Sequence, residues 1–358
     1  MVVNFFKMAD LFVEHIKREH PEDIAIVAYY GSYASGTQNP NSDFDLFFIP
    51  TTERGKKLSD CIILDGIGID FFSISWERAE RIANFDEYIV SVIADCKLLY
   101  VRSEKDKERI ESLRERIKSY QKPEKRKDML DKAYKEFSNV YRPLYNLRKS
   151  DDLSDQRIES FRALTTILQT VVLINQTYLK SGWGKNFNQI FSLQLQPDGL
   201  KELAHQVIYS KSKSEMLSAL EILTNRTANL LNIERDKLRP HSSFKDVFEN
   251  FYEELRSTFL KIETACDNNQ AEIAFCATLT LQNEVRQCLR TVGDTSIEAR
   301  FSELEPVRKY DPSNLELLKK ATTRYEKELL ELLERNGVPI TSLDNLEEFR
   351  KYLEKANY

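Results

Sequence analysis

The chain has 358 residues, 41% hydrophobic and 30% charged, so it can form two or three domains with sizeable cores. Its 57 acidic and 52 basic side chains give a net charge of −5. That balance argues weakly against a nucleic-acid partner, whose binding face needs excess Lys and Arg, and would suit a small cationic substrate. No leader-like segment and no apolar run near the ~20 residues of a membrane span occurs, so we expect a cytoplasmic protein without a membrane partner. The five cysteines, odd in number and scattered, are expected to be reduced, and the four histidines are too dispersed for a zinc site.

The first part of the chain predicts a small α+β domain over residues 1–102, with a short mixed sheet. Helical spacing of apolar residues predicts an opening helix that Pro21 ends. Asp65-Gly66 separates two apolar runs and is a strong hairpin signal. Ser75 resembles a helix N-cap. The expected elements in order are a helix over 4–20, strands over 24–30 and 43–49, a hairpin within 56–75, helices over 76–85 and 86–94, and an edge strand over 96–101.

The rest of the chain predicts an all-α region, because apolar residues recur there at spacings of three and four. We expect a helical bundle domain over 103–235 and an all-α extension over 236–358. The stretch 293–310 is expected to be an irregular connector. The expected helices are 104–121, 125–147, 155–181, 197–209, 214–231, 244–267, 270–292, 312–336 and 346–358.

The stretch from Tyr29 to Pro50, YYGSYASGTQNPNSDFDLFFIP, carries the most chemical information. Asp43 and Asp45 are two residues apart on an expected strand, so they point to the same face. Two carboxylates on an otherwise apolar strand repel each other unless a cation lies between them. The Gly31-Ser32 turn offers backbone N–H groups and a hydroxyl to a phosphate. Metal and phosphate together indicate nucleotide chemistry.

A third strand carboxylate, Asp70, would join the first two if its strand is adjacent in the sheet. Mg²⁺ prefers carboxylate oxygens together with substrate phosphates and water. In the structural alternative, Asp43 caps the loop, Asp45 faces solvent on an edge strand, and Asp70 pairs with an arginine. The joint pattern of these three carboxylates with the Gly-Ser turn favours the metal site.

This pattern resembles the polymerase-β-type nucleotidyltransferase superfamily, and within it the kanamycin (aminoglycoside) nucleotidyltransferases, which join such a domain to a helical bundle. The resemblance implies that Gly31 and Ser32 contact the nucleotide phosphates. It further implies that Asp43 and Asp45 bind Mg²⁺ and that Asp70 completes the metal site or assists the base, so all three aspartates count as catalytic and metal-binding. The cofactors implied are Mg²⁺ and ATP or another NTP as co-substrate.

The same resemblance implies that Glu136 is the general base on the first long bundle helix. Glu136-Phe137 followed by Tyr141-Arg142 resembles the local pattern of the family. The alternative is a solvated glutamate paired with a lysine one helical turn away. The sequence departs from the family pattern at two positions. The family has an arginine shortly after Gly-Ser, where this chain has Ser35 and Gly36, and a lysine between the base and the aromatic-Arg pair, where this chain has Val140.

A second cluster is less specific. Trp183 stands between two glycines near Lys180, Lys185 and Asn186, and these residues would either line a substrate cleft or form a turn that ends a helix.

We therefore expect a Mg²⁺-dependent nucleotidyltransferase that moves a nucleoside monophosphate, AMP from ATP, to a hydroxyl of a small molecule such as an aminoglycoside. Two alternatives stay open: transfer to a macromolecule (tRNA or a protein, as toxin-like relatives do), and a non-catalytic nucleotide-binding or scaffold protein. The oligomeric state is open, a homodimer included.

Overall fold

The structure, a computed structural model, describes residues 4–39, 42–182, 184–238 and 242–355. Its internal contacts divide the chain into two compact units, residues 1–238 and 239–358. Among the described helices, none combines the length and apolar character needed to cross a membrane.

The first unit opens with a five-stranded mixed sheet of order β3-β4-β2-β1-β5. β2 and β4 pair in parallel, and the other neighbours pair antiparallel. The expected α+β domain is confirmed, with β5 at one edge of the sheet. The Asp65-Gly66 hairpin is also confirmed, both residues having positive φ (52° and 80°). The strands are β1 (Ile24–Tyr29), β2 (Phe44–Pro50), β3 (Asp60–Leu64), β4 (Ile67–Ser73) and β5 (Lys97–Val101).

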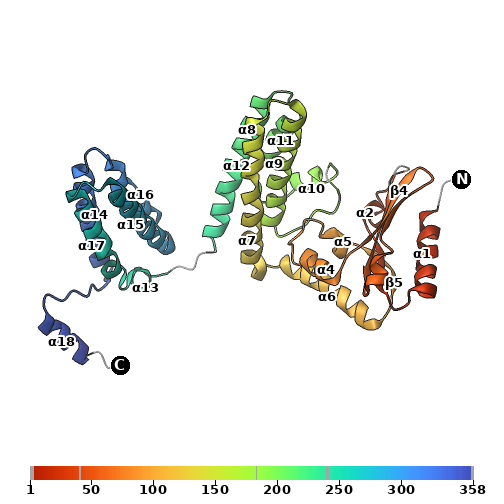
Figure 1. Cartoon of the computed structure of the whole chain (residues 1–358), viewed down its shortest axis with the longest axis horizontal. Helices are drawn as coiled ribbons and strands as arrows, with labels where there is room; N and C mark the ends of the chain where they lie inside the picture. The colour runs from red at the N-terminus through yellow and green to blue at the C-terminus, as the bar shows by residue number, and fades with distance from the viewer. Residues whose placement is uncertain (1–3, 40–41, 183, 239–241, 356–358) are drawn as a thin grey trace. The chain divides into compact units, whose positions relative to one another are not determined.

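Each face of the sheet is covered by helices (Figure 1). α1 (Phe5–Glu19) packs Phe5, Ala9, Val13 and Ile16 against one face, where the alternate β2 side chains Phe44, Leu46 and Phe48 point. The opposite face, which holds Phe47 and Ile49, joins the core of the helical bundle. The helices on that side are α4 (Trp76–Ala83), α5 (Ser91–Ala94) and α6 (Glu104–Tyr120), while the short α2 (Gly31–Ser35) and α3 (Glu53–Lys56) follow β1 and β2. Ser75 is the N-cap of α4, as expected.

A helical bundle continues the first unit, with its long helix α9 packed against the helices around it. A partly buried ion pair, Arg126 Nη2 to Glu234 Oε2 at 2.6 Å, joins the start of α7 to α12. The elements are η1 (Pro123–Lys125), α7 (Arg126–Phe137), η2 (Ser138–Val140), α8 (Tyr141–Lys149), α9 (Leu153–Ile174), α10 (Phe187–Phe191), α11 (Leu200–Tyr209) and α12 (Lys213–Asp236).

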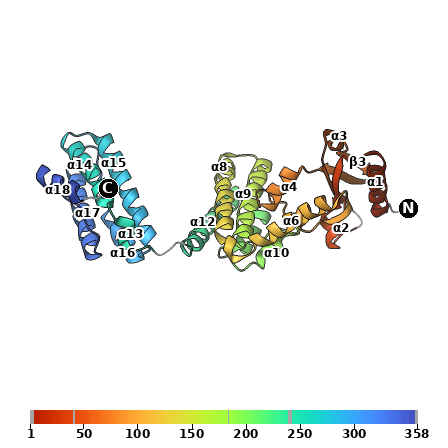
Figure 2. The same cartoon turned by 90° about the horizontal axis from the view of Figure 1, so that it is seen from below.

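The second unit has its own hydrophobic core, to which Phe259, Leu281, Leu329 and Leu333 contribute. α14 packs against both α15 and α17, and these helices lie side by side in two views (Figures 1 and 2). Its elements are α13 (Phe244–Phe248), α14 (Phe251–Asp267), α15 (Ala271–Val292), α16 (Thr295–Leu304), η3 (Pro306–Lys309), α17 (Glu316–Arg335) and α18 (Leu346–Lys355).

Several expected helix boundaries were wrong. The helix over 125–147 is interrupted by η2, because Pro143 has no N–H to donate to the Asn139 carbonyl. The helix expected to reach 181 ends at Ile174. The helix over 244–267 breaks at Asn250, whose φ is 59°. The expected connector 293–310 contains α16, capped by Asp294.

Candidate functional site

Asp45 and Asp70 lie side by side because β2 and β4 pair in parallel with these two residues in register. β2 is an interior strand with β4 on one side and β1 on the other, so Asp45 is not on an edge strand. Asp43 immediately precedes β2 and is exposed. Alternation along β2 and β4 directs Asp45 and Asp70 to the face of the sheet that the bundle covers.

The electrostatics of this face reflect three neighbouring carboxylates. Partial burial, followed by the charges of Asp43 and Asp70, raises the pKa of Asp45 from 3.8 to about 7. Burial and the same three carboxylates raise the pKa of the adjacent Tyr30. Like charges held this close favour a cation between them or a proton on one of them.

Gly31 allows the turn to lie directly over Asp45. Its φ is 69°, and a Cβ at this position would overlap Asp45 Oδ2. The Tyr30 N–H donates to the Asp45 carbonyl at 3.0 Å, which fixes the approach. The Ser32 hydroxyl is buried and has no hydrogen-bond partner among the described residues. A buried hydroxyl of this kind is suited to a ligand oxygen.

Asp70 is held from the outer strand. The Cys61 thiol, opposite Asp70 on β3, donates to Asp70 Oδ1 at 3.3 Å, a contact that the sequence analysis missed. Within the described ranges, Asp70 forms no ion pair with an arginine. The thiol orients one carboxylate oxygen and leaves the other available.

The residues present fit a hard divalent cation. In the described part of the chain, no three His, Cys, Asp or Glu side chains converge closely enough to hold a metal ion by themselves. Mg²⁺ is commonly held by one or two carboxylates with substrate phosphates and water. The adjacent pair Asp45 and Asp70, the elevated pKa of Asp45, and the unpartnered Ser32 hydroxyl next to Gly31 in sequence match that donor set.

Glu136 lies elsewhere, in a hollow of about 920 Å³ formed by α7, α9 and the loop after α4. Burial raises the pKa of its carboxyl, and the Asn139 amide donates to Oε2 at 3.5 Å. Lys132 pairs with Asp86 at 2.7 Å, so the expected alternative, a Glu136 paired with Lys132, is not what the structure has.

The same hollow contains a polar group that the sequence analysis missed. Gln169, in the apolar stretch of α9, is buried, and its Oε1 has no hydrogen-bond donor among the described residues. A lone amide in an apolar helical run was the available signal. The hollow is acidic, with five carboxylates and two lysines, and aromatic rings line it; its acidic and basic members are Asp86, Glu87, Asp128, Asp131, Glu136, Lys132 and Lys135.

The aspartates and the hollow lie on the same side of the sheet. Phe47, which shares its face of β2 with Asp45, belongs to the hydrophobic core that also contains Phe85 and Leu173, and these two residues line the hollow.

The two departures from the expected pattern have structural roles. The Ser35 hydroxyl donates to the Gly31 carbonyl at 3.1 Å and to the Ser32 carbonyl at 3.2 Å, so it stabilises α2 itself. Val140 is fully buried in the bundle core. Trp183 lies outside the described residues, and Lys180 lines a separate hollow beside Gly31.

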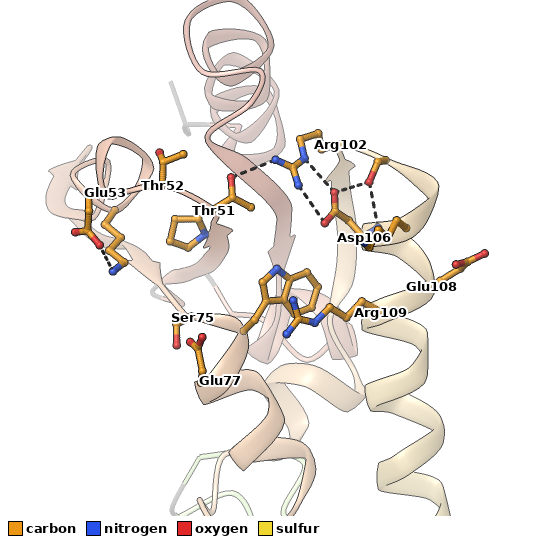
Figure 3. Close-up of a pocket in the computed structure, with 14 residues that line it drawn as sticks. Thr51, Thr52, Glu53, Ser75, Glu77, Arg102, Asp106, Glu108 and Arg109 are labelled. Carbon is orange, nitrogen blue, oxygen red and sulfur yellow. Dashed lines mark hydrogen bonds and ion pairs between the residues drawn. The ribbon is translucent and has the colours of Figure 1, made fainter.

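A further hollow, of about 850 Å³, lies where β2, β4 and β5 end (Figure 3). Its charges are balanced, and three of its four cations are paired: Lys56 with Glu53, Arg102 with Asp106, and Arg109 with Glu80. Arg109 also stacks on Trp76 at 4.3 Å. These contacts join α6 to the sheet and leave little free charge for a ligand.

Comparison with known proteins gives two family matches. The nucleotidyltransferase domain family matches residues 10–132, and the KNTase C-terminal domain family matches residues 107–235. No protein with a curated description matches the chain in sequence. A solved nucleotidyltransferase-like protein from Exiguobacterium sibiricum is 12% identical, with a TM-score of 0.37 over 70% of this chain and 86% of that one. The two family matches therefore identify a polymerase-β-like nucleotidyltransferase domain over residues 10–132, followed by a KNTase C-terminal domain over residues 107–235.

Proposed function

We propose that this nucleotidyltransferase moves AMP from ATP to a hydroxyl of a small cationic molecule such as an aminoglycoside, with Mg²⁺ as cofactor. The observation that carries the proposal is the in-register pair Asp45 and Asp70 beneath the Gly31 turn. Asp43, Asp45 and Asp70 would hold Mg²⁺, which when bound neutralises phosphate charge and favours ionisation of the attacking hydroxyl.

The turn and the base have separate tasks in this reaction. Gly31 and Ser32 bind phosphate oxygens through backbone N–H groups and the Ser32 hydroxyl. Glu136 accepts the proton of the acceptor hydroxyl as its oxygen attacks the α-phosphorus, and pyrophosphate leaves from the other side. Burial raises the pKa of Glu136 toward the range in which a general base is effective.

The hollow at Glu136 supports a cationic acceptor with several hydroxyls. Three of its carboxylates are already paired: Asp86 with Lys132, Glu87 with Arg78 and Asp128 with Lys125. Asp131 and Glu136 have no ion pair within the described residues and favour an ammonium group, and the unpartnered Gln169 Oε1 needs a donor such as an amine or hydroxyl. We propose that the domains 1–102 and 103–235 together form the enzyme and that 236–358 is an all-α extension to it.

Pyrophosphate release from ATP with Mg²⁺, measured against a panel of aminoglycosides, tests this function. We expect the acceptor mass to increase by one adenylyl group (AMP less water), and Asp45→Asn and Asp70→Asn to abolish the product while retaining the fold by circular dichroism. Exposed Asp10→Asn on α1 is the matched control. Label from α-³²P-ATP on RNA or protein would replace the small acceptor with a macromolecule, and unchanged turnover in both site variants would refute the proposal.

A further inference from the structure

We propose that Lys97 and Lys180 bind the β- and γ-phosphates of the nucleotide in the hollow beside Gly31. This inference rests on the proposed nucleotidyl transfer and identifies the cationic side chains that serve it. The hollow has a volume of about 550 Å³, within the usual range of small-molecule sites.

The hollow adjoins the carboxylates. Gly31, Ala34 and Ser35 of α2 form one wall, and Gly31 is the residue whose Cβ would overlap Asp45. The opposite walls come from residues 91–98 and from Lys180 in the loop after α9. A triphosphate with its α-phosphorus near Asp45 can therefore extend from Gly31 into this hollow.

The segment around the site cannot neutralise a triphosphate by itself. Residues 29–50 contain no lysine or arginine, although they supply two of the three carboxylates. Mg²⁺ would supply part of the positive charge that a triphosphate requires, and cationic side chains for the rest have to come from other elements. The hollow beside Gly31 provides them, since Lys97, Arg114 and Lys180 line it against one carboxylate, Asp95.

Arg114 is already committed to the protein. Its Nη2 donates to the Cys96 carbonyl at 2.6 Å, its Nε to the Ile93 carbonyl at 3.3 Å, and its Nη1 to Glu111 at 2.7 Å. These bonds hold the residues between α5 and β5 in place. Arg114 therefore shapes the wall, and phosphate binding falls to the two lysines.

Lys97 and Lys180 are free for this role. Both are exposed, and neither ammonium group has a hydrogen bond or ion pair within the described part of the chain. The backbone that carries Lys180 is fixed, because the Lys180 N–H donates to Gln189 Oε1 at 3.2 Å and the Ser181 N–H to Asn186 Oδ1 at 3.0 Å. An ammonium on a fixed backbone is suited to phosphate as a point charge.

Calorimetric titration of the full chain with ATP, AMP and pyrophosphate, each with Mg²⁺, tests the inference. We expect Lys97→Ala and Lys180→Ala each to weaken ATP and pyrophosphate binding about tenfold, and the double variant about a hundredfold. AMP affinity should stay unchanged, because AMP has no β- or γ-phosphate. Lys180→Arg should restore most of the ATP affinity, and Lys201→Ala, an exposed lysine of α11 outside the hollow, is the control.

Two results would overturn the inference: ATP affinity that both alanine variants retain, or an equal loss for ATP and AMP, which indicates a structural role for the lysines. A wild-type chain that binds none of the three probes and releases no pyrophosphate refutes the proposed function itself, and this inference with it. ATP binding and pyrophosphate release by the wild-type chain thus separate the two failures.

Discussion

Replacing Asp45 with asparagine should stabilise the protein while abolishing nucleotidyl transfer. The pKa of Asp45 is about 7 in the folded chain against 3.8 as a free side chain, so the folded state binds the extra proton between those values. Stability therefore falls as pH rises from about 4 to 7 and stays level above pH 7. Asparagine carries no charge and removes this penalty.

The magnitude follows from the shift. A pKa raised from 3.8 to about 7 corresponds to ~4 kcal/mol of stability if solvent does not screen the charges. The Asp45 side chain is only partly buried, and solvent screening reduces this to about 2 kcal/mol. For a unit of this size, the melting temperature should rise by about 4–8 °C at pH 8.

Urea unfolding and calorimetry of wild type and Asp45→Asn at half-unit steps from pH 4 to 8 measure the effect. The difference in unfolding free energy should be small at pH 4, grow to pH 7 and then stay constant, and Asp10→Asn should show no such curve. Mg²⁺ with ATP should stabilise the wild type selectively. A variant that is no more stable at pH 8, or a difference that is flat across the range, would refute the reasoning.

Three further predictions concern the turn, the base and the bundle. Gly31→Ala should lower the free energy of unfolding by more than the ~1–2 kcal/mol of a left-handed alanine and abolish activity, because the new Cβ would overlap the Asp45 carboxylate. Gly36→Ala is the control: its φ is 70° but the space around it is open, so urea unfolding should show the backbone cost alone. Glu136→Gln should lower kcat about 10²–10⁴-fold with ATP affinity unchanged, and the wild-type rate should fall as pH drops through the raised Glu136 pKa; a variant with the wild-type profile would exclude the base role. Arg126→Met should destabilise the first unit by about 1–3 kcal/mol in denaturant, because Glu234 loses Arg126 but keeps Lys237 as a partner. Adding Glu234→Leu should recover most of the loss, whereas additive losses would contradict the ion pair.

Local signals predicted the sheet domain well, because its turns are encoded by neighbouring residues. Asp65-Gly66 adopts the positive φ values that a tight hairpin needs, and Ser75 caps α4 through its own side chain. The adjacency of Asp45 and Asp70 depends instead on parallel pairing of strands far apart in sequence. The sequence indicated that Asp70 would join the other two aspartates if its strand were adjacent, but it could not predict the pairing register of β2 and β4.

The helix boundaries show where apolar periodicity is insufficient. The signals that correct it are single residues: Pro143 removes a donor inside the expected helix 125–147, Asn250 adopts a left-handed conformation, and Asp294 caps a helix within the expected connector. The hollow at Glu136 combines residues from α7, α9 and the loop after α4. Local sequence patterns do not predict which distant segments form a hollow. The only sequence signal for Gln169 was therefore a lone amide in an apolar helical run.

The distribution of charge implies that neither domain of the first unit is sufficient for the reaction. Residues 29–50 contain Asp43, Asp45 and the proposed phosphate-binding turn but no lysine or arginine. The proposed base, Glu136, and one proposed phosphate ligand, Lys180, come from the stretch that matches the KNTase C-terminal domain. Because the bundle core is continuous with the sheet face that carries Asp45, the same packing that stabilises the fold also brings the acidic and basic halves of the site to one side of the sheet. Removal of the bundle would therefore leave the proposed nucleotide site with unbalanced negative charge and without its proposed base, so we expect nucleotidyl transfer to require both domains.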